Sequence, residues 1–222
     1  VMREGPLYEA WIQKRDLPFI IIGPQLPMFG MDTIDYIANR KNFPLPQRLE
    51  GGVPPRPDEF PTPFKMEPEA AAIRFPDALP PPGWEREEKD LMKMIDQVII
   101  EYNGDPDRIY LTGLSYGGFG TWYLANKHPK TWAAISPIVG WGHPDLMEPI
   151  AKNKIPLWVF AGGRDRGVSL RYFYAGLNKL EELGHHDVRF TIEMDMNHDA
   201  WRRVYGGNDL YEWFLEHKLG EK

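Results

Sequence analysis

The sequence predicts an α/β fold with a doubly wound, mainly parallel sheet. From residue 84 of the 222-residue chain onward, short apolar runs alternate with segments whose apolar residues recur at helical spacing. Strands that alternate with helices in this way form parallel sheets with helices on both faces. A Gly-x-Ser-x-Gly motif between one apolar run and the helical segment after it supports the same prediction. The length suits a single domain over residues 1–222.

The beginning of the chain is predicted to hold a helix and then a buried strand. Residues 7–17 mix apolar and charged side chains, which fits a helix that ends before Pro18. Residues 19–22 are a continuous apolar run, as expected for a strand covered on both faces.

Residues 24–83 are predicted to be a proline-rich insertion within this domain. They hold 14 of the 22 prolines, so continuous regular structure is not expected there. So long an excursion is typical of a lid, a binding loop or a surface wrap. Its aromatic and methionine side chains indicate that it packs onto something, and simple surface packing is favoured over a place at the rim of a functional site.

The remaining elements follow in alternation. Residues 84–102 are predicted to be a helix, because Leu91, Ile95 and Val98 share one face, and residues 103–106 end it. A strand at residues 109–111 leads into a helix that reaches about Asn126. Later apolar runs predict strands at 132–139, 157–161 and 188–192, a helix over 170–183 and a closing helix at 210–218.

Gly113, Ser115 and Gly117 form the Gly-x-Ser-x-Gly motif. Between a strand and a helix this pattern is typical of a nucleophile elbow, a turn so sharp that residues without a Cβ beside the serine relieve crowding. Ser115 would then lie at a helix N-terminus, where the N–H of Tyr116 is expected to stabilise an oxyanion. The alternative, an ordinary glycine-rich turn, is disfavoured because strand, turn and helix signals agree.

A nucleophilic serine needs a base and an acid, and in a parallel sheet both should follow the carboxyl ends of strands. His198 meets this condition after the 188–192 strand, and His143 after the 132–139 strand is its rival. Asp165 follows the 157–161 strand and is the predicted acid. The alternative for Asp165 is an Asx-turn or a pairing with a neighbouring arginine. The residues set aside are His128, His185, His186 and His217 as bases, Asp145 and Asp195 as reserve acids, and Ser136 and Ser169 as nucleophiles.

Composition narrows the function classes. A formal net charge of −6 without a basic cluster argues against a nucleic-acid partner, and the absence of cysteine excludes thiol catalysis and cysteine-bound zinc. The sequence predicts neither a metal site nor a cofactor, since His185, His186 and Asp187 lack ligand spacing. No apolar run approaches the ~20 residues of a membrane span, so no membrane partner is expected. Localisation is left open by the residues.

At residues 105–122, 155–160 with Asp165, 197–201 and 210–215, the chain resembles serine esterases of the α/β-hydrolase superfamily. The nearest group is that of feruloyl esterases, polyhydroxybutyrate depolymerases and predicted secreted peptidases, and the resemblance covers most of residues 90–218. It implies that Ser115 is the nucleophile, His198 the base and Asp165 the acid, and it favours an extracellular protein.

The chain departs from that group in two respects. It has Ala161 and Gly162 where His-Gly is common, which we expect to change local packing only. The fold also usually places several strands and an oxyanion loop before the strand that residues 19–22 resemble. We therefore expect that the chain begins partway into the fold, and that an upstream segment or another chain completes the sheet and gives the second oxyanion donor.

Three functions follow as hypotheses. The leading one is a carboxylesterase that hydrolyses a small-molecule ester through an acyl-enzyme. The second is a serine peptidase of the prolyl-oligopeptidase type, because residues 115–119 also resemble that elbow. The third is a binding domain that retains the elbow without catalysis.

Overall fold

The computed structural model describes residues 3–26, 46–58 and 83–220. Contacts divide the chain into two units, one of Val1–Gly51 with Pro82–Gly104 and the other of Gly52–Pro81 with Asp105–Lys222. We describe each unit by itself. The single domain over residues 1–222 stays a prediction, and most of the proline-rich insertion at 24–83 lies outside the described residues.

The described residues of the first unit contain two helices. The short π-helix η1 covers Tyr8–Ile12, and the Tyr8 hydroxyl donates a hydrogen bond to the Gln47 carbonyl at 3.1 Å. The predicted helix over 7–17 is therefore too long, because Lys14 has a φ of 61°, which a right-handed helix does not allow.

The strand predicted at residues 19–22 is wrong. These residues form no strand, the Phe19 N–H donates locally to the Leu17 carbonyl, and Ile20 is 53% exposed. An apolar run becomes a strand only where a neighbouring strand pairs with its backbone groups, and composition alone does not supply that neighbour.

The second helix of this unit, α2, covers Trp84–Tyr102 and confirms the predicted bounds. Asn103 ends it in the left-handed conformation, with φ 53°, and donates its N–H to the Ile99 carbonyl. Burial on the predicted apolar face is incomplete, since Leu91 is buried while Met94 and Tyr102 are exposed.

The second unit is built on a parallel sheet, as predicted. Within the described residues it has four strands in the order β1-β2-β3-β4, and each pairs with the next in parallel. Their bounds are Tyr110–Leu114 for β1, Ala134–Ile138 for β2, Leu157–Gly162 for β3 and Val188–Glu193 for β4. Whether a further segment or chain extends this sheet stays a prediction.

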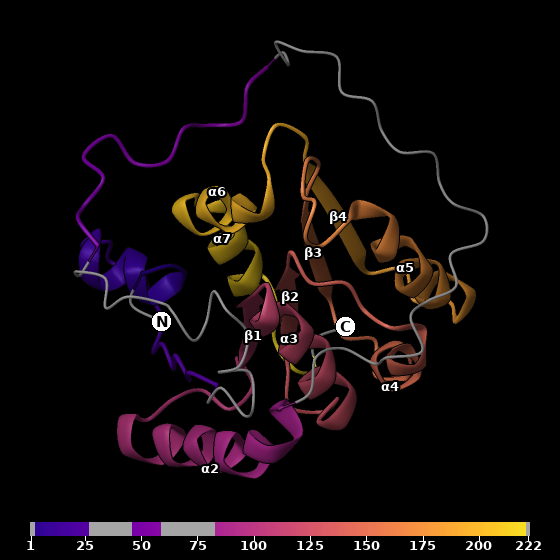
Figure 1. The fold of residues 1–222 in the computed structure, drawn as a ribbon. Coiled ribbons are helices and arrows are strands. Elements are labelled where there is room, and N and C mark those ends of the chain that lie inside the picture. Colours follow the sequence, from indigo (N-terminus) through magenta and orange to yellow (C-terminus); the bar gives the residue numbers. More distant parts are fainter. Residues whose placement is uncertain (1–2, 27–45, 59–82, 221–222) are drawn as a thin grey trace. The chain divides into compact units, whose positions relative to one another are not determined.

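Helices cover both faces of this sheet (Figure 1). On one face, Phe173 of α5 stacks on Phe190 of β4. On the other face, Trp213 of α7 meets Trp158 of β3 edge-on. The helices are α3 Tyr116–Lys127, α4 Met147–Lys152, α5 Phe173–Glu182, α6 Trp201–Gly206 and α7 Asp209–Leu215, with single 3-10 turns at η3 Pro144–Leu146, η4 Leu170–Tyr172 and η5 His198–Ala200.

Sequence patterns missed α4 and α6, the two shortest α-helices of the second unit's described residues. Each has only six residues, and a periodic apolar pattern needs a longer window. The closing helix was predicted at 210–218 and ends earlier, at Leu215. The core between sheet and helices consists of large, fully buried side chains: Trp122, Ile135, Ile138, Ile150, Leu157, Phe173, Leu180, Tyr205 and Trp213. The four strands, and therefore their carboxyl ends, are held in place by a well-packed core.

Candidate active site

Ser115 occupies a sharp turn between β1 and α3. Its φ of 52° and ψ of −113° lie outside the regions that a non-glycine residue normally adopts, which costs of order 1–3 kcal/mol. The Ser115 N–H donates to the carbonyl of Ile138 at 2.9 Å, which ties the turn to the end of β2. A strained serine held by its neighbours at a strand-to-helix turn is the geometry of a nucleophile elbow.

Crowding that only glycine relieves was predicted at Gly113 and Gly117, and the structure shows it at Gly113 alone of these two. A Cβ on Gly113 would overlap the carbonyl group of Gly117, whereas a Cβ on Gly117 would meet no other atom within 4 Å. The close approach that the sequence did not reveal is that of Gly118 in α3 to the end of β2, since a Cβ on Gly118 would lie 2.8 Å from the Ile138 oxygen and 3.1 Å from Gly140 Cα. The expectation of crowding at Gly117 is thus wrong, and Gly118 lets α3 approach the end of β2.

The structure brings the three predicted triad residues together. The Nε2 atom of His198 lies 2.8 Å from Ser115 Oγ, and its Nδ1 atom lies 2.6 Å from Asp165 Oδ2. A carboxylate only accepts hydrogen bonds, so Nδ1–H is the donor to Asp165, and in a neutral imidazole Nε2 then accepts the Ser115 hydroxyl proton. The ring also meets Trp201 edge-on, with centroids 5.2 Å apart.

The Asp165 side chain is fully buried, while the His198 side chain is 37% exposed. Asp165 Oδ1 accepts the N–H groups of Gly167 and Val168 at 2.8 and 2.9 Å. The Asx-turn considered as an alternative therefore exists, but it uses one oxygen and leaves the other for His198. This arrangement fixes the direction of the carboxylate before the imidazole binds to it.

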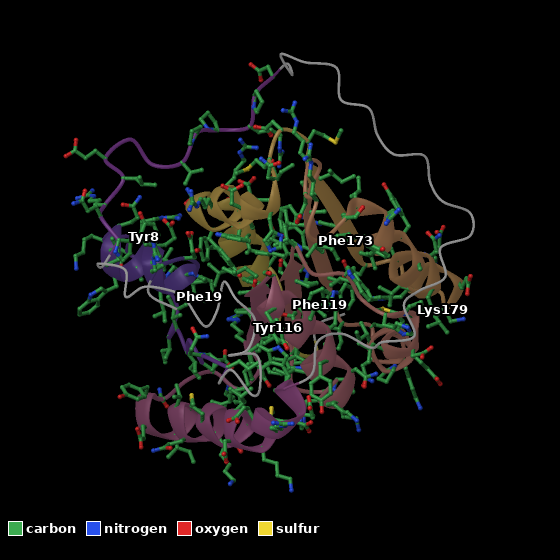
Figure 2. All side chains as sticks on the ribbon, viewed as in Figure 1. Tyr8, Phe19, Tyr116, Phe119, Phe173 and Lys179 are labelled. Atoms are coloured by element: carbon green, nitrogen blue, oxygen red, sulfur yellow. The ribbon has the colours of Figure 1, made fainter. Side chains whose placement is uncertain are left out.

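Tyr116, the predicted oxyanion residue, begins α3, so its N–H belongs to the first turn of a 12-residue helix. Figure 2 labels Tyr116 and, one turn later, Phe119, whose ring meets Trp141 edge-on. The N-terminus of a helix carries a partial positive charge, so this end of α3 is an environment that favours negative charge.

Six of the residues that were set aside have other partners for their side chains. His143, the rival base, accepts the Asp145 N–H on Nδ1 and caps η3. Of the reserve acids, Asp195 binds Arg203 and Asp145 lies 3.5 Å from His143. The remaining contacts are His185 to the Ile155 carbonyl, His217 to the Trp213 carbonyl, and Ser136 to the Trp158 carbonyl.

Sequence reasoning missed a charged cluster beside His198, formed by Glu193, Asp195, Arg203 and Arg56. Hydrogen bonds from Arg203 lower the pKa of Asp195, and hydrogen bonding to Asp195 raises the pKa of Arg203. The signal in the sequence was Glu193 itself, an acidic residue at the end of the apolar run that forms β4. In the structure this residue is 1% exposed.

Among the described residues, no group of three or more histidine, cysteine or acidic side chains has the arrangement of a metal site.

Similarity to known proteins agrees with this geometry. The profile of the prolyl oligopeptidase family matches residues 84–144. The poly(3-hydroxyalkanoate) depolymerase C of Paucimonas lemoignei is 38% identical over 50 residues, which are 22% of this chain and 12% of that protein. The crystal structure of a thermostable esterase superposes with a TM-score of 0.54 and 33% identity, over 60% of this chain and 37% of that one.

The chain thus spans little more than a third of the length of the esterase structure that it resembles, and about an eighth of the depolymerase. The parallel sheet, its flanking helices and these likenesses indicate an α/β-hydrolase fold like that of serine esterases. The chain is therefore similar to serine hydrolases. No helix in the described part of the chain is long and apolar enough to span a bilayer.

Proposed function

We propose that this protein hydrolyses carboxylic esters through an acyl-enzyme intermediate, with Ser115 as nucleophile, His198 as base and Asp165 as acid. The observation that carries the proposal is the position of His198, whose two ring nitrogens lie within hydrogen-bond distance of Ser115 Oγ and Asp165 Oδ2. A nucleophile, a base and an orienting carboxylate in this order are what acyl transfer requires.

In the first half of the reaction, His198 Nε2 takes the proton of the Ser115 hydroxyl as Oγ attacks the ester carbonyl. The carbonyl oxygen becomes an oxyanion, which the N–H of Tyr116 and the N-terminus of α3 stabilise. The tetrahedral intermediate collapses when the imidazolium gives its proton to the leaving alcohol oxygen. Asp165 holds the imidazole in the required tautomer and stabilises its positive charge.

In the second half, water replaces the alcohol. His198 removes a proton from the water molecule, whose oxygen attacks the acyl carbonyl and forms a second oxyanion in the same place. Collapse of this intermediate returns the proton to Ser115 Oγ and releases the carboxylic acid. The 37% exposure of the His198 side chain is compatible with entry of water and a substrate.

Ester hydrolysis is favoured over peptide hydrolysis by the esterase likeness at 33% identity and by the match to the depolymerase. The prolyl oligopeptidase profile over residues 84–144 keeps peptide hydrolysis as the second candidate. Both reactions use the same triad, and they differ in the leaving group. A non-catalytic binding role would leave the strained Ser115 backbone without a purpose.

The test is turnover of a short-chain p-nitrophenyl ester by the wild type, Ser115→Ala and His198→Ala. We expect turnover by the wild type and a fall in kcat of roughly 10⁶-fold in either variant, the size seen when a triad nucleophile or base is removed. Ser169→Ala is the matched control, because this serine lies at the start of η4 and should retain full activity. Cleavage of a proline-containing peptide anilide with no cleavage of the ester would favour the peptidase, and a folded wild type inactive on both would contradict the proposal.

A further inference from the structure

The end of β4 carries a buried carboxylate between two arginines. Glu193 is 1% exposed, and its Oε2 atom accepts hydrogen bonds from Arg203 Nη1 at 2.9 Å and Arg56 Nε at 3.1 Å. Burying a carboxylate costs free energy unless the charge is paired in this way. The ion pairs therefore hold both guanidinium groups at Glu193.

Arg203 connects this carboxylate to a second one on the same loop. Its Nη1 and Nη2 atoms bind the two oxygens of Asp195 at 2.7 and 2.8 Å, a bidentate pairing that fixes direction as well as distance. The Arg203 side chain is only 13% exposed. Residues 193–203 are therefore closed into a ring by one guanidinium, and His198 lies midway along this stretch of the chain.

The same loop is joined to the strand that bears the acid. The Gly163 N–H donates to the Glu193 carbonyl, and the Arg164 N–H donates to the Met196 carbonyl, both at 2.9 Å. A Cβ on Gly162 would overlap the Asn197 carbonyl, so backbones touch directly beside His198. A displacement of residues 193–197 would therefore change the place of His198 relative to Asp165.

We propose that Arg203 is a positioning residue for His198, which by closing the 193–203 loop onto Glu193 and Asp195 holds the imidazole between Ser115 and Asp165. This inference rests on the proposed function for its kinetic consequence. Arg203 touches none of the reacting groups, and its effect passes through the backbone of the loop. A triad works only when its groups are held within a fraction of an ångström, and an error of ~1 Å costs roughly 10²-fold in rate.

Arg56 and Pro54 form the outer side of this cluster. Arg203 Nε donates to the Pro54 carbonyl at 3.2 Å, and the Arg56 side chain is 52% exposed. Pro54 and Arg56, which belong to the proline-rich insertion and to the second unit, thus contact the loop that carries His198. Without Arg56, Glu193 would still bind Arg203, and the 193–203 loop would stay closed. Loss of Arg203 is therefore the change that we expect to open the loop.

The experiment compares Arg203→Met with Arg202→Met. Arg202 is the neighbouring residue of the same helix, is 51% exposed and pairs with Asp199 at 3.8 Å, so it provides the same chemical change outside the cluster. For the p-nitrophenyl ester, we expect kcat of Arg203→Met to fall roughly 10²-fold with KM nearly unchanged. Arg202→Met should keep wild-type kinetics.

A second measurement needs no substrate. In protein labelled with ¹⁵N-histidine, the ring nitrogen shifts of His198, assigned by their absence in His198→Asn, report whether the proton stays on Nδ1. We expect Arg203→Met to move these shifts toward those of a free imidazole and Arg202→Met to leave them in place. If Arg203→Met does not fold, Arg203→Lys replaces it, because lysine keeps the charge but not the bidentate geometry.

The outcomes separate the two proposals. Absence of ester hydrolysis by the wild type overturns the proposed function, while the ring shifts still decide the role of Arg203. Unchanged His198 shifts in the folded Arg203 variant overturn the positioning proposal. A lower unfolding temperature with wild-type kcat and wild-type shifts also overturns it, because that result describes a purely structural residue.

Discussion

Two buried carboxylates at the ends of adjacent strands, Asp165 after β3 and Glu193 at the end of β4, have opposite surroundings. Asp165 is held by two backbone N–H groups on one oxygen and offers the other to His198, a side chain that changes its charge easily. Glu193 faces two guanidinium groups, which keep their charge at all ordinary pH values. In the proposed roles, the same functional group therefore supports proton transfer by His198 in one place and closes a loop in the other.

The two carboxylates differ in the side chain that each binds and in how exposed that side chain is to solvent. Asp165 binds a half-exposed imidazole that contacts Ser115, so its negative charge matters when the imidazole becomes protonated. Glu193 binds Arg203 and Arg56 and contacts no reacting group. Replacement of Asp165 should accordingly change the rate with little change in stability, and replacement of Glu193 should first change stability.

The largest expected effect is that of Asp165→Asn on catalysis. The asparagine amide donates a hydrogen bond to Nδ1 and favours the wrong tautomer, so kcat for the p-nitrophenyl ester should fall about 10⁴-fold. Asp145→Asn is the matched control, since the Asp145 side chain is exposed and lies 3.5 Å from His143, away from Ser115 and His198 in the sequence. Steady-state kinetics measure both, and wild-type kcat in Asp165→Asn would remove Asp165 from the triad.

The second largest effect is expected for Glu193→Gln, which should lower the free energy of unfolding. Removing the charge leaves Asp195 as the remaining carboxylate bound to Arg203 and takes away the anion bound to Arg56. Breaking an ion pair whose carboxylate is buried in this way costs about 3 kcal/mol or more. Urea unfolding at neutral pH measures the change. Glu182→Gln, an exposed carboxylate bound to Lys179 at 3.0 Å, should stay within about 0.5 kcal/mol of the wild type. Equal midpoints for the two variants would contradict the architectural role of Glu193.

The pH dependence of stability sharpens the comparison at Asp195. Hydrogen bonds from Arg203 lower its pKa in the folded state, so the stabilisation is fully present above the unfolded pKa of about 3.9 and is lost as the pH falls through the lower folded value. Asp195→Asn should lose about 2 kcal/mol at neutral pH. The gap to the wild type should begin to narrow below about pH 4 and close once the pH is below the folded pKa, as followed by urea unfolding over a pH series. A gap that persists in acid would show that the lost contribution is not ionic.

The smallest expected effect is that of Arg56→Ala. The Arg56 side chain is 52% exposed, and solvent screens its ion pair, so the loss should be about 1 kcal/mol or less even though Glu193 is buried. Hydrogen exchange of the β4 loop provides a sensitive second measurement. A loss as large as that of Glu193→Gln would mean that the outer arginine, rather than Arg203, closes the cluster.

Sequence patterns predicted the elements that depend on neighbours along the chain. α2 has the predicted bounds because its apolar spacing and its Asn103–Gly104 end are local signals, and the elbow was recognisable because strand, glycine and serine are contiguous. The rule that functional groups follow the carboxyl ends of parallel strands selected Ser115, Asp165 and His198 as candidates that the fold brings together. Their catalytic roles remain proposals until variants are measured.

The strand predicted at 19–22 failed for the opposite reason, because a strand needs a partner that no local pattern specifies.

By itself, the sequence determined the alternation of strands and helices, the elbow at Ser115 and the short list of bases and acids, since each of these depends on residues within a few positions of one another. Only the tertiary structure decided that His198 lies between Ser115 and Asp165, which are 83 and 33 residues away from it. It alone also placed Arg56, 137 residues from Glu193, on the same carboxylate as Arg203. Contacts over such separations depend on how strands pair and helices pack, and these are properties of the whole chain.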